Sequence, residues 1–227
     1  MKAYMADVSP LEDETLYNKA LSVLSPRIRE QIAAFRFEAD RRRETASQWL
    51  LRYGLLLEWG RDPGEPALRF GVRGKPYLLD DPELFFNISH SGQYALCAFD
   101  HSEIGADVQE IRPVKDSVFK YALNPIEKEE LARSDDRLND FFSLWAMKES
   151  VMKFTGLGLG LPLKTFSVTL DGQLIWHGDT YYPCRVKLFP WPEGCRTAVC
   201  TALDSEPAEP EFVDLEEIIA GGLFHGE

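Results

Sequence analysis

The chain has 227 residues and a mass of 25.8 kDa, which corresponds to one large domain or two small ones at roughly 100–200 residues per domain. Its apolar share of 44% and charged share of 27% are those of a globular protein and exclude a disordered, collagenous or coiled-coil chain. The apolar runs, such as Tyr94–Phe99, are far shorter than the roughly 20 residues of a membrane helix. Because a charge also precedes any signal-peptide core, we expect a soluble, cytoplasmic protein that does not enter a membrane.

The net charge of −12 is unevenly distributed, because eight acids lie in the segment Asp204–Glu227, which has no Lys or Arg. An acidic surface argues against nucleic acid as a partner. It still allows a locally basic pocket for a small polyanion. The candidate basic cluster consists of Arg36, Arg41, Arg42, Arg43 and Arg52. A solvated helix face is the alternative for this cluster.

The four cysteines contain no C-x-x-C pair. We expect them to be buried thiols of a protein in a reducing compartment.

The first sixty residues are mainly helical in pattern. Residues 11–37 are predicted to form two short helices broken at Ser25-Pro26, because Ser25 can cap a helix and Pro26 fits its first position. Residues 40–59 predict a longer helix with apolar side chains at helical spacing. The segment 60–66 predicts the loop that ends it.

Three strands are predicted in close succession, at Leu84–Ile88, Gln93–Phe99 and Ile104–Gln109. The short turns between them predict an antiparallel meander. In such an order, the end of the first strand and the end of the third lie at the same end of the sheet. We therefore expect His90 and Asp107 to face one site.

The second half of the chain repeats this plan of helices followed by strands. Helical segments are predicted at about 115–134 and 139–154. Strands are predicted at 164–170, 173–177, 184–189 and 196–203, with Asp171-Gly172 as a hairpin turn. Two short matches, of Trp49–Arg52 with Trp145–Lys148 and of Ala95–Cys97 with Ala198–Cys200, agree with an internal repeat.

These patterns predict an α+β fold of two similar subdomains with mainly antiparallel sheets, related by a pseudo-two-fold axis. The predicted boundaries are 1–101 for the N-terminal subdomain and 102–203 for the C-terminal one. An acidic C-terminal segment, 204–227, is expected to contain a short helix near Val213–Ala220 that stops at Gly221-Gly222.

The strand Ile104–Gln109 carries a candidate metal ligand. Alternation puts Gly105, Asp107 and Gln109 on one face of the strand, and Gly105 would leave open space beside Asp107. Mg²⁺ suits such a place, because it takes one or two carboxylates and completes its coordination with water and phosphate oxygens. A solvated strand face is the alternative.

The helical segment 139–154 places Trp145, Glu149 and Lys153 at successive i, i+4 positions on one face. Lys148 lies about 100° away from Glu149 around the helix. This arrangement offers one metal ligand, Glu149, flanked by two lysines that could bind phosphate. The alternative is a Glu149–Lys153 pair on the surface.

The run Phe86–Gly92 contains a serine and a histidine, but it lacks the glycine two residues before the serine that a hydrolase nucleophile elbow has. A turn rich in Ser, His and Gly can instead offer hydroxyl, imidazole and backbone N–H groups to a phosphate. Ser89 and His90 are therefore candidate phosphate ligands.

Four motifs, in their order and spacing, resemble those of the 4'-phosphopantetheinyl transferases. They are Gly74-Lys75-Pro76, Phe86–Gly92, Ile104–Asp107 and Trp145–Lys153. The length and the two-part plan resemble the surfactin-synthetase-activating type, a monomeric pseudo-dimer, which implies an active site at the interface of the two subdomains. The likeness covers about residues 25–203.

The resemblance implies transfer of the 4'-phosphopantetheine arm of coenzyme A to a serine of an apo acyl or peptidyl carrier protein, with release of adenosine 3',5'-bisphosphate. It implies Asp107, Glu149 and Lys153 as catalytic residues, with Asp107 and Glu149 holding Mg²⁺ and Glu149 assisting removal of the serine proton. The implied contacts to coenzyme A are Arg43 and His90 at the 3'-phosphate, Arg73 and the Gly74-Lys75-Pro76 loop near the adenine, and Ser89, Lys148 and Lys153 at the phosphates.

Two positions depart from the family pattern. Many members have an acid where this chain has Gln109, so the third metal ligand would be this amide or a water. Members can also carry lysines where Ile28 and Gln31 stand, so the 3'-phosphate would depend more on Arg43, with Arg29 or Arg36 in support.

Two other functions stay open, a non-catalytic coenzyme A-binding adaptor that docks carrier proteins and a Mg²⁺-dependent phosphohydrolase. The apolar stretch Ser117–Leu123 is a candidate ledge for the carrier, with core packing as the alternative. The sequence does not select a particular carrier or pathway.

Overall fold

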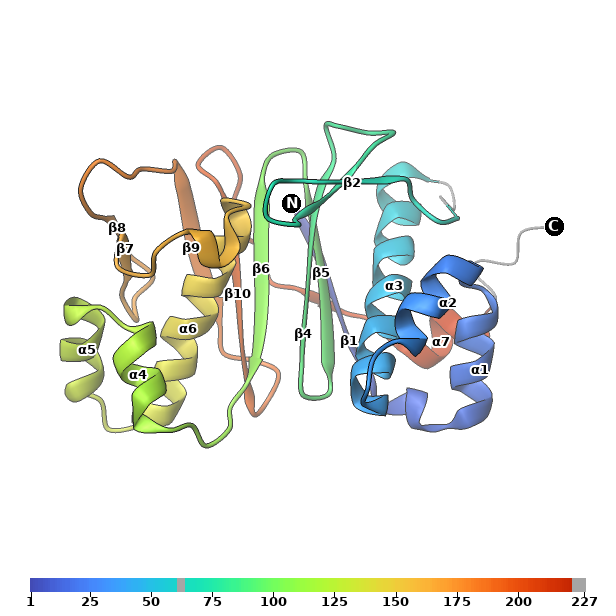
Figure 1. The fold of residues 1–227 in the computed structure, drawn as a ribbon, viewed down its shortest axis with the longest axis horizontal. Coiled ribbons are helices and arrows are strands. Elements are labelled where there is room, and N and C mark those ends of the chain that lie inside the picture. Colours follow the sequence, from blue (N-terminus) through green and yellow to red (C-terminus); the bar gives the residue numbers. More distant parts are fainter. Residues whose placement is uncertain (61–63, 222–227) are drawn as a thin grey trace.

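The computed structural model describes residues 1–60 and 64–221, in which two sheets lie side by side at the centre and helices cover their outer sides (Figure 1). One sheet has the strand order β11-β1-β5-β4 and the other β6-β10-β9. The longer strands are β1 (Lys2–Asp7), β4 (Phe85–Ser91), β5 (Tyr94–Asp100), β6 (Ile104–Glu110), β9 (Cys184–Phe189) and β10 (Cys195–Ala202). The short strands are β2 (Leu68–Phe70), β3 (Pro76–Leu78), β7 (Phe166–Val168), β8 (Leu174–Trp176) and β11 (Glu211–Phe212).

The helices divide between the two outer sides. The α-helices are α1 (Glu14–Ser22), α2 (Pro26–Ala33), α3 (Glu38–Trp59), α4 (Asp116–Ala122), α5 (Pro125–Ala132), α6 (Arg137–Phe154) and α7 (Leu215–Ala220). Short 3₁₀ helices occupy Ser9–Glu12 and Gly158–Gly160. The long helix α3 packs on β5, and α6 takes the corresponding place on β10 in the other half. The two short sequence matches lie in these same elements, one in α3 and α6 and the other in β5 and β10. The predicted α+β fold with mainly antiparallel sheets is confirmed.

Local signals account for the helix ends. The Ser25 hydroxyl accepts the N–H of Ile28 at 3.3 Å and caps α2, as the sequence predicts. Helix α3 ends at Gly60, whose φ of +70° suits glycine. Of the loop predicted after it, residues 61–63 lie outside the described residues.

The helical segment predicted at 115–134 is divided into α4 and α5. The division comes from Asn124-Pro125, because proline fits the first position of a new helix but not the interior of a longer one. The Asn124 side chain accepts the N–H of Glu127, and the Glu127 carboxylate accepts the N–H of Asn124. This capping box fixes the start of α5.

The predicted three-stranded meander is correct for its first pair and wrong for its third strand. Strands β4 and β5 are antiparallel, from Phe85 opposite Asp100 to Ser91 opposite Tyr94. Strand β6 pairs instead with β10, a partner more than 80 residues further along the chain. It runs beside β4 in the same direction (Figure 1).

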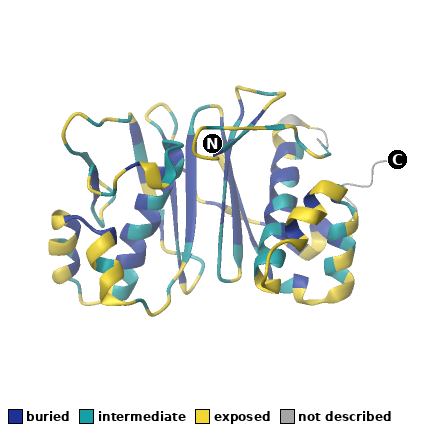
Figure 2. Cartoon of the chain, in the orientation of Figure 1, coloured by how far each residue is buried: buried dark blue, intermediate teal, exposed yellow. Residues whose placement is uncertain are grey.

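The central core lies between the two sheets. It contains Met5, Leu96, Ile104, Ala106 and Val108, all buried. Figure 2 shows the buried strands at the centre and the exposed residues on the outer helices. The opposite face of each sheet packs on the helices of its own half. The four cysteines are buried and free, as predicted.

The acidic C-terminal segment returns to the N-terminal half. Strand β11 pairs in parallel with β1, and the apolar side of α7 enters the N-terminal core through Leu215, Ile218 and Ile219. The acids within these two elements, Glu211, Glu216 and Glu217, are exposed, so they lie on the outer side of the segment that completes the first sheet. Of the stop predicted at Gly221-Gly222, the second glycine lies outside the described residues.

The sequence context predicts open space at Gly105, beside Asp107, but the structure leaves no such space. A Cβ atom at this position would lie 2.0 Å from the Ser150 carbonyl oxygen and 2.3 Å from the Phe154 nitrogen. The glycine instead lets the backbone of α6 approach β6. This close approach brings the polar side chains of α6 to those of β6.

We expect Gly105→Ala to lower the free energy of unfolding by about 1–3 kcal/mol or more, because the new methyl group forces α6 away from β6. Urea denaturation followed by circular dichroism measures the loss. The matched control is Gly71→Ala, whose methyl group would meet mainly the movable ring of Tyr77 at 3.2 Å. Equal stability of Gly105→Ala and the parent would contradict the close helix–strand contact.

Candidate active site

A cavity of about 500 Å³ opens where the two halves of the chain meet. Its N-terminal side comes from α2, α3, β2, β4, and β3 with the loop before it, and its C-terminal side comes from β6 and α6. The polar residues lining it are Arg27, Gln31, Glu44, Gln48, Ser89, His90, Asp107, Glu149 and Lys153. Gly74 and Pro76 also line it, together with the apolar side chains of Ile28, Leu51, Leu68, Phe70, Phe86 and Ile88. The cavity therefore brings together His90 and Asp107, although not through the meander from which this was predicted.

Asp107 lies at the centre of the polar contacts, and its side chain is 2% exposed. Its Oδ1 atom accepts hydrogen bonds from the Ser89 hydroxyl at 2.8 Å and from the Lys153 ammonium at 2.7 Å. Its Oδ2 atom accepts the amide N–H of Gln109 at 2.8 Å. Three different elements, β4, β6 and α6, thus satisfy one buried carboxylate.

Glu149 faces the same cavity from α6. Burial, together with the charge of Asp107, raises the pKa of Glu149 to about 7, and the nearby Lys153 only partly opposes this. A carboxyl group with this pKa exchanges its proton near neutral pH. The repulsion between the two carboxylates also marks a place where a cation would be stabilised.

His90 lies on the N-terminal side of the cavity, beside Glu44 of α3. Burial lowers the pKa of His90, and the Glu44 carboxylate opposes this shift. Glu44 in turn accepts a hydrogen bond from the amide of Gln48 at 2.8 Å. No sequence motif marks Glu44 and Gln48, although Glu44 directly follows Arg43 and Gln48 lies about one turn further along the same helix.

The charges that line the cavity do not favour an anion by themselves. Glu44, Asp107 and Glu149 contribute three acids, against Arg27 and Lys153. Among the described residues, both of these cations already have an acidic partner, because Arg27 pairs with Glu65 and Lys153 with Asp107. A polyanionic substrate would therefore need a further cation.

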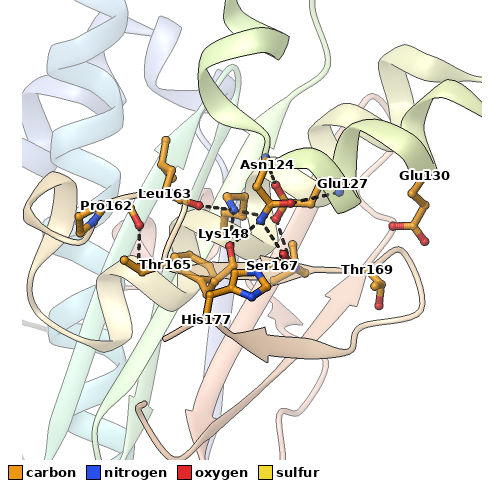
Figure 3. A network of polar contacts seen from close by, with 12 residues as sticks. Asn124, Glu127, Glu130, Lys148, Pro162, Leu163, Thr165, Ser167, Thr169 and His177 are labelled. Atoms are coloured by element: carbon orange, nitrogen blue, oxygen red, sulfur yellow. Dashed lines mark hydrogen bonds and ion pairs between the residues drawn. The ribbon is translucent and has the colours of Figure 1, made fainter. Parts of the chain in front are cut away.

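Lys148 lies outside the cavity lining, away from the place where its contact with a phosphate is predicted. Figure 3 shows its ammonium pointing toward Glu127 and the loop that holds Leu163. It donates to Glu127 Oε1 at 2.7 Å and to the carbonyl oxygens of Leu163 and Phe166 at 2.9 and 3.1 Å. The side chain is fully buried, so it fastens α6 to α5 and to the segment that leads into β7.

Three further residues expected to bind coenzyme A also lie outside the cavity lining. The Lys75 ammonium is buried and donates to Glu103 at 2.6 Å and to the Ile104 carbonyl oxygen at 2.8 Å. It therefore joins its loop to the start of β6. Arg73 lies against Gly160, and the guanidinium of Arg36 lies over the ring of Phe37.

Arg43 stands beside the cavity rather than in its lining. Its guanidinium donates to Asp40 at 2.5 Å and to the Gly92 carbonyl oxygen at 2.9 Å. It is close enough to His90 to help lower the pKa of that imidazole. Arg43 thus borders the part of the cavity that contains His90 and Glu44.

The donor set fits Mg²⁺ without a third acid. No group of three or more His, Cys, Asp or Glu side chains with metal-binding geometry occurs in the part of the chain that the structure describes. Two carboxylates, those of Asp107 and Glu149, suffice when water and substrate phosphates complete the coordination. Gln109 donates its amide N–H to Asp107, an arrangement that orients the carboxylate, and the choice of the third ligand between this amide and a water stays a prediction.

Comparison with known proteins identifies the family. The family model described as the 4'-phosphopantetheinyl transferase superfamily matches residues 103–200, and the N-terminal 4'-phosphopantetheinyl transferase model matches residues 9–102. The chain is 36% identical over 217 residues to the 4'-phosphopantetheinyl transferase Sfp of Bacillus subtilis, covering 92% of this chain and 96% of that protein. The chain belongs to the 4'-phosphopantetheinyl transferase superfamily.

More distant relatives have the same activity in their names. A 4'-phosphopantetheinyl transferase of Bacillus pumilus is 29% identical over 95% of this chain and 94% of its own length. A human phosphopantetheinyl transferase, named for L-aminoadipate-semialdehyde dehydrogenase, is 28% identical over 74% of this chain and 60% of its own. The family resemblance based on four sequence motifs is confirmed, and this transferase is an enzyme of that class. None of its described helices is both long enough and apolar enough to span a membrane.

The raised pKa of Glu149 predicts a pH-dependent stability of the metal-free transferase. Because the folded protein holds this proton more tightly than the unfolded chain, the contribution of Glu149 to stability falls as pH rises from about 4.5 to about 7. We expect Glu149→Gln, measured in EDTA, to be more stable than the parent at pH 8 by on the order of 2 kcal/mol. At pH 4 the two should be nearly equal, and a constant difference across this range would contradict the prediction.

Proposed function

We propose that this transferase moves the 4'-phosphopantetheine arm of coenzyme A to a serine hydroxyl of an apo acyl or peptidyl carrier protein, in a Mg²⁺-dependent reaction that releases adenosine 3',5'-bisphosphate. The observation that carries the proposal is the pairing of two carboxylates, Asp107 and Glu149, with Lys153 in a cavity between the halves. The relatives named as phosphopantetheinyl transferases support the class of reaction.

Asp107 and Glu149 are the residues that would hold Mg²⁺. When bound, the ion would neutralise charge on the pyrophosphate of coenzyme A. This assignment is supported by the excess of acids over bases in the cavity lining and by the unfavourable proximity of the two carboxylates. Gln109 keeps Asp107 oriented through its hydrogen bond.

Glu149 is the group best suited to receive the serine proton. Its carboxylate faces the cavity from α6 and can accept the proton of a serine hydroxyl that enters there. The serine oxygen forms a bond to the β-phosphorus, and the bond from that phosphorus to the departing adenosine bisphosphate breaks. Lys153, whose side chain is 26% exposed in the cavity, stabilises negative charge on the phosphate oxygens.

His90 and Arg43 are proposed to meet the 3'-phosphate, with Gly74 and Pro76 beside the adenine. His90, Gly74 and Pro76 line the cavity, and Arg43 borders it next to His90. Lys75, Lys148, Arg36 and Arg73 lie outside the cavity lining, and their contacts to coenzyme A stay predictions. Ile28 and Gln31 line the same side of the cavity and offer no charge to a phosphate.

We also propose a division into subdomains 1–101 and 102–203, with the segment after 203 completing the first. The two family models meet at residues 102 and 103. Because one chain supplies both sides of the cavity, we propose a monomer, and the free, buried cysteines agree with the cytoplasm as its compartment.

The direct test incubates the full chain with an apo carrier protein, coenzyme A and Mg²⁺, and follows the carrier by intact mass spectrometry. We expect the carrier to gain one phosphopantetheine in Mg²⁺ and none in EDTA. A panel of apo carriers identifies the preferred partner. A stable complex without a mass gain would indicate the adaptor, and release of inorganic phosphate without a carrier would indicate the phosphohydrolase.

The carrier is proposed to dock on the surface formed by α4 and the start of α5. Val118, Tyr121 and Ile126 are exposed there, and the adjacent groove is bordered by Lys120, Lys128 and Arg137. Phe119 and Leu123 of the same stretch pack into the core instead. Exposed apolar groups beside basic ones complement a partner with apolar residues flanked by acids.

We expect Tyr121→Asp to raise the Michaelis constant for the carrier at least ~10-fold, on the scale of losing one aromatic contact at an interface, and to leave that for coenzyme A unchanged. The control is Tyr181→Asp, which alters a similarly exposed tyrosine far from α4 in sequence. Steady-state kinetics with each substrate varied in turn measures both constants. If the two variants behave alike, the carrier does not dock through Tyr121.

A further inference from the structure

Strands β4 and β6 are joined by side chains rather than by a backbone ladder. The side-chain oxygens of Asn87, Ser89 and Ser91 accept the backbone N–H groups of Ala106, Val108 and Glu110, respectively, at 2.8, 3.2 and 3.0 Å. The three acceptors alternate along β4, so they point to one side of the strand. Because β6 belongs to the C-terminal sheet, these bonds connect the two halves of the chain directly beside the cavity.

Ser89 differs from the other two members of this row, because it has a second partner. Its hydroxyl donates to Asp107 Oδ1 at 2.8 Å while its oxygen accepts the N–H of Val108. A hydroxyl has a single proton. Ser89 therefore cannot donate to a substrate phosphate without giving up its bond to Asp107.

The geometry points to Ser89 as a positioning residue for Asp107, and not as a ligand of the coenzyme A phosphates. This inference rests on the proposed function, in which the Asp107 carboxylate is part of the reacting site. Ser89 comes from the N-terminal half and Asp107 from the C-terminal half, so the bond makes the carboxylate's orientation depend on the contact between the halves.

The three hydrogen-bond partners of the Asp107 carboxylate explain why the Ser89 hydroxyl is needed to hold its orientation. Gln109 holds Oδ2, and Ser89 and Lys153 share Oδ1. Lys153 is on α6 and its side chain is partly exposed. It is the group proposed to stabilise negative charge on the phosphate oxygens of the substrate. If Lys153 turns to a phosphate, Ser89 is left as the partner that still holds Oδ1.

The experiment compares Ser89→Ala with Ser91→Ala. Both variants remove one hydroxyl that accepts an N–H of β6, but only Ser89 touches Asp107. For Ser89→Ala we expect kcat to fall about 10–100-fold, the range for losing a group that orients a metal-binding side chain. The Michaelis constant for coenzyme A should change less than about 3-fold, since uniform substrate binding is retained. Ser91→Ala should match the parent.

A second measurement does not depend on turnover. Mn²⁺ serves as a spectroscopic probe, and its affinity for the protein in the presence of coenzyme A is measured by electron paramagnetic resonance. We expect Ser89→Ala to weaken Mn²⁺ about 10-fold or more and Ser91→Ala to leave it unchanged. Ser89→Thr, which keeps the hydroxyl, should retain most of the parent's affinity and kcat.

Thermal unfolding establishes that the variants are folded. If Ser89→Ala is not, Ser89→Cys provides the comparison, because it keeps the volume and has only a weak S–H donor. A raised Michaelis constant for coenzyme A with normal kcat and Mn²⁺ affinity would overturn the inference and make Ser89 a substrate ligand. Equal losses in Ser89→Ala and Ser91→Ala would also overturn it. If the parent transfers no phosphopantetheine, the proposed function fails, whereas the Mn²⁺ comparison still tests Ser89.

Discussion

The burial of the Asp107 carboxylate between the two halves is the constraint on which the rest of the site depends. An ionised group out of contact with water is tolerated only when hydrogen bonds and an opposite charge satisfy it. Here β4 provides Ser89, β6 provides Gln109 and α6 provides Lys153. The position of β6 beside β4, and the close approach of α6 to Gly105, are both needed for these contacts. The orientation of the Asp107 side chain, on which the proposed chemistry depends, is therefore set by the packing of β4, β6 and α6.

Three lysines near this site show how burial separates structural from functional charges. Lys75 and Lys148 are 5% and 0% exposed, and each is surrounded by a carboxylate and backbone carbonyl oxygens. They fasten a loop and a helix, and a substrate cannot reach them without breaking those contacts. Lys153 is 26% exposed and opens to the cavity. Its ammonium can therefore serve both Asp107 and a bound phosphate.

Much of the fold was predictable because its signals are local. Ser25-Pro26 starts α2, and the spacing of Trp145, Glu149 and Lys153 puts two of the site residues on one face of α6. The partner of β6 was not predictable, since the choice between β5 and β10 depends on contacts far apart in sequence. The different roles of Lys148 and Lys153 could not be predicted either, because Glu127, the ion-pair partner of Lys148, lies on another helix. Glu44 carried no motif, and only its place beside His90 reveals it.

The Mg²⁺ dependence of carrier modification by Asp107→Asn, measured beside the parent, tests the role of the Asp107 carboxylate most directly. The substitution keeps the size of the side chain and removes its charge. We expect that the variant still folds and binds coenzyme A, while its turnover falls at least ~10²-fold at every Mg²⁺ concentration. Turnover close to that of the parent at limiting Mg²⁺ would contradict the assignment of Asp107 as the charged centre of the site.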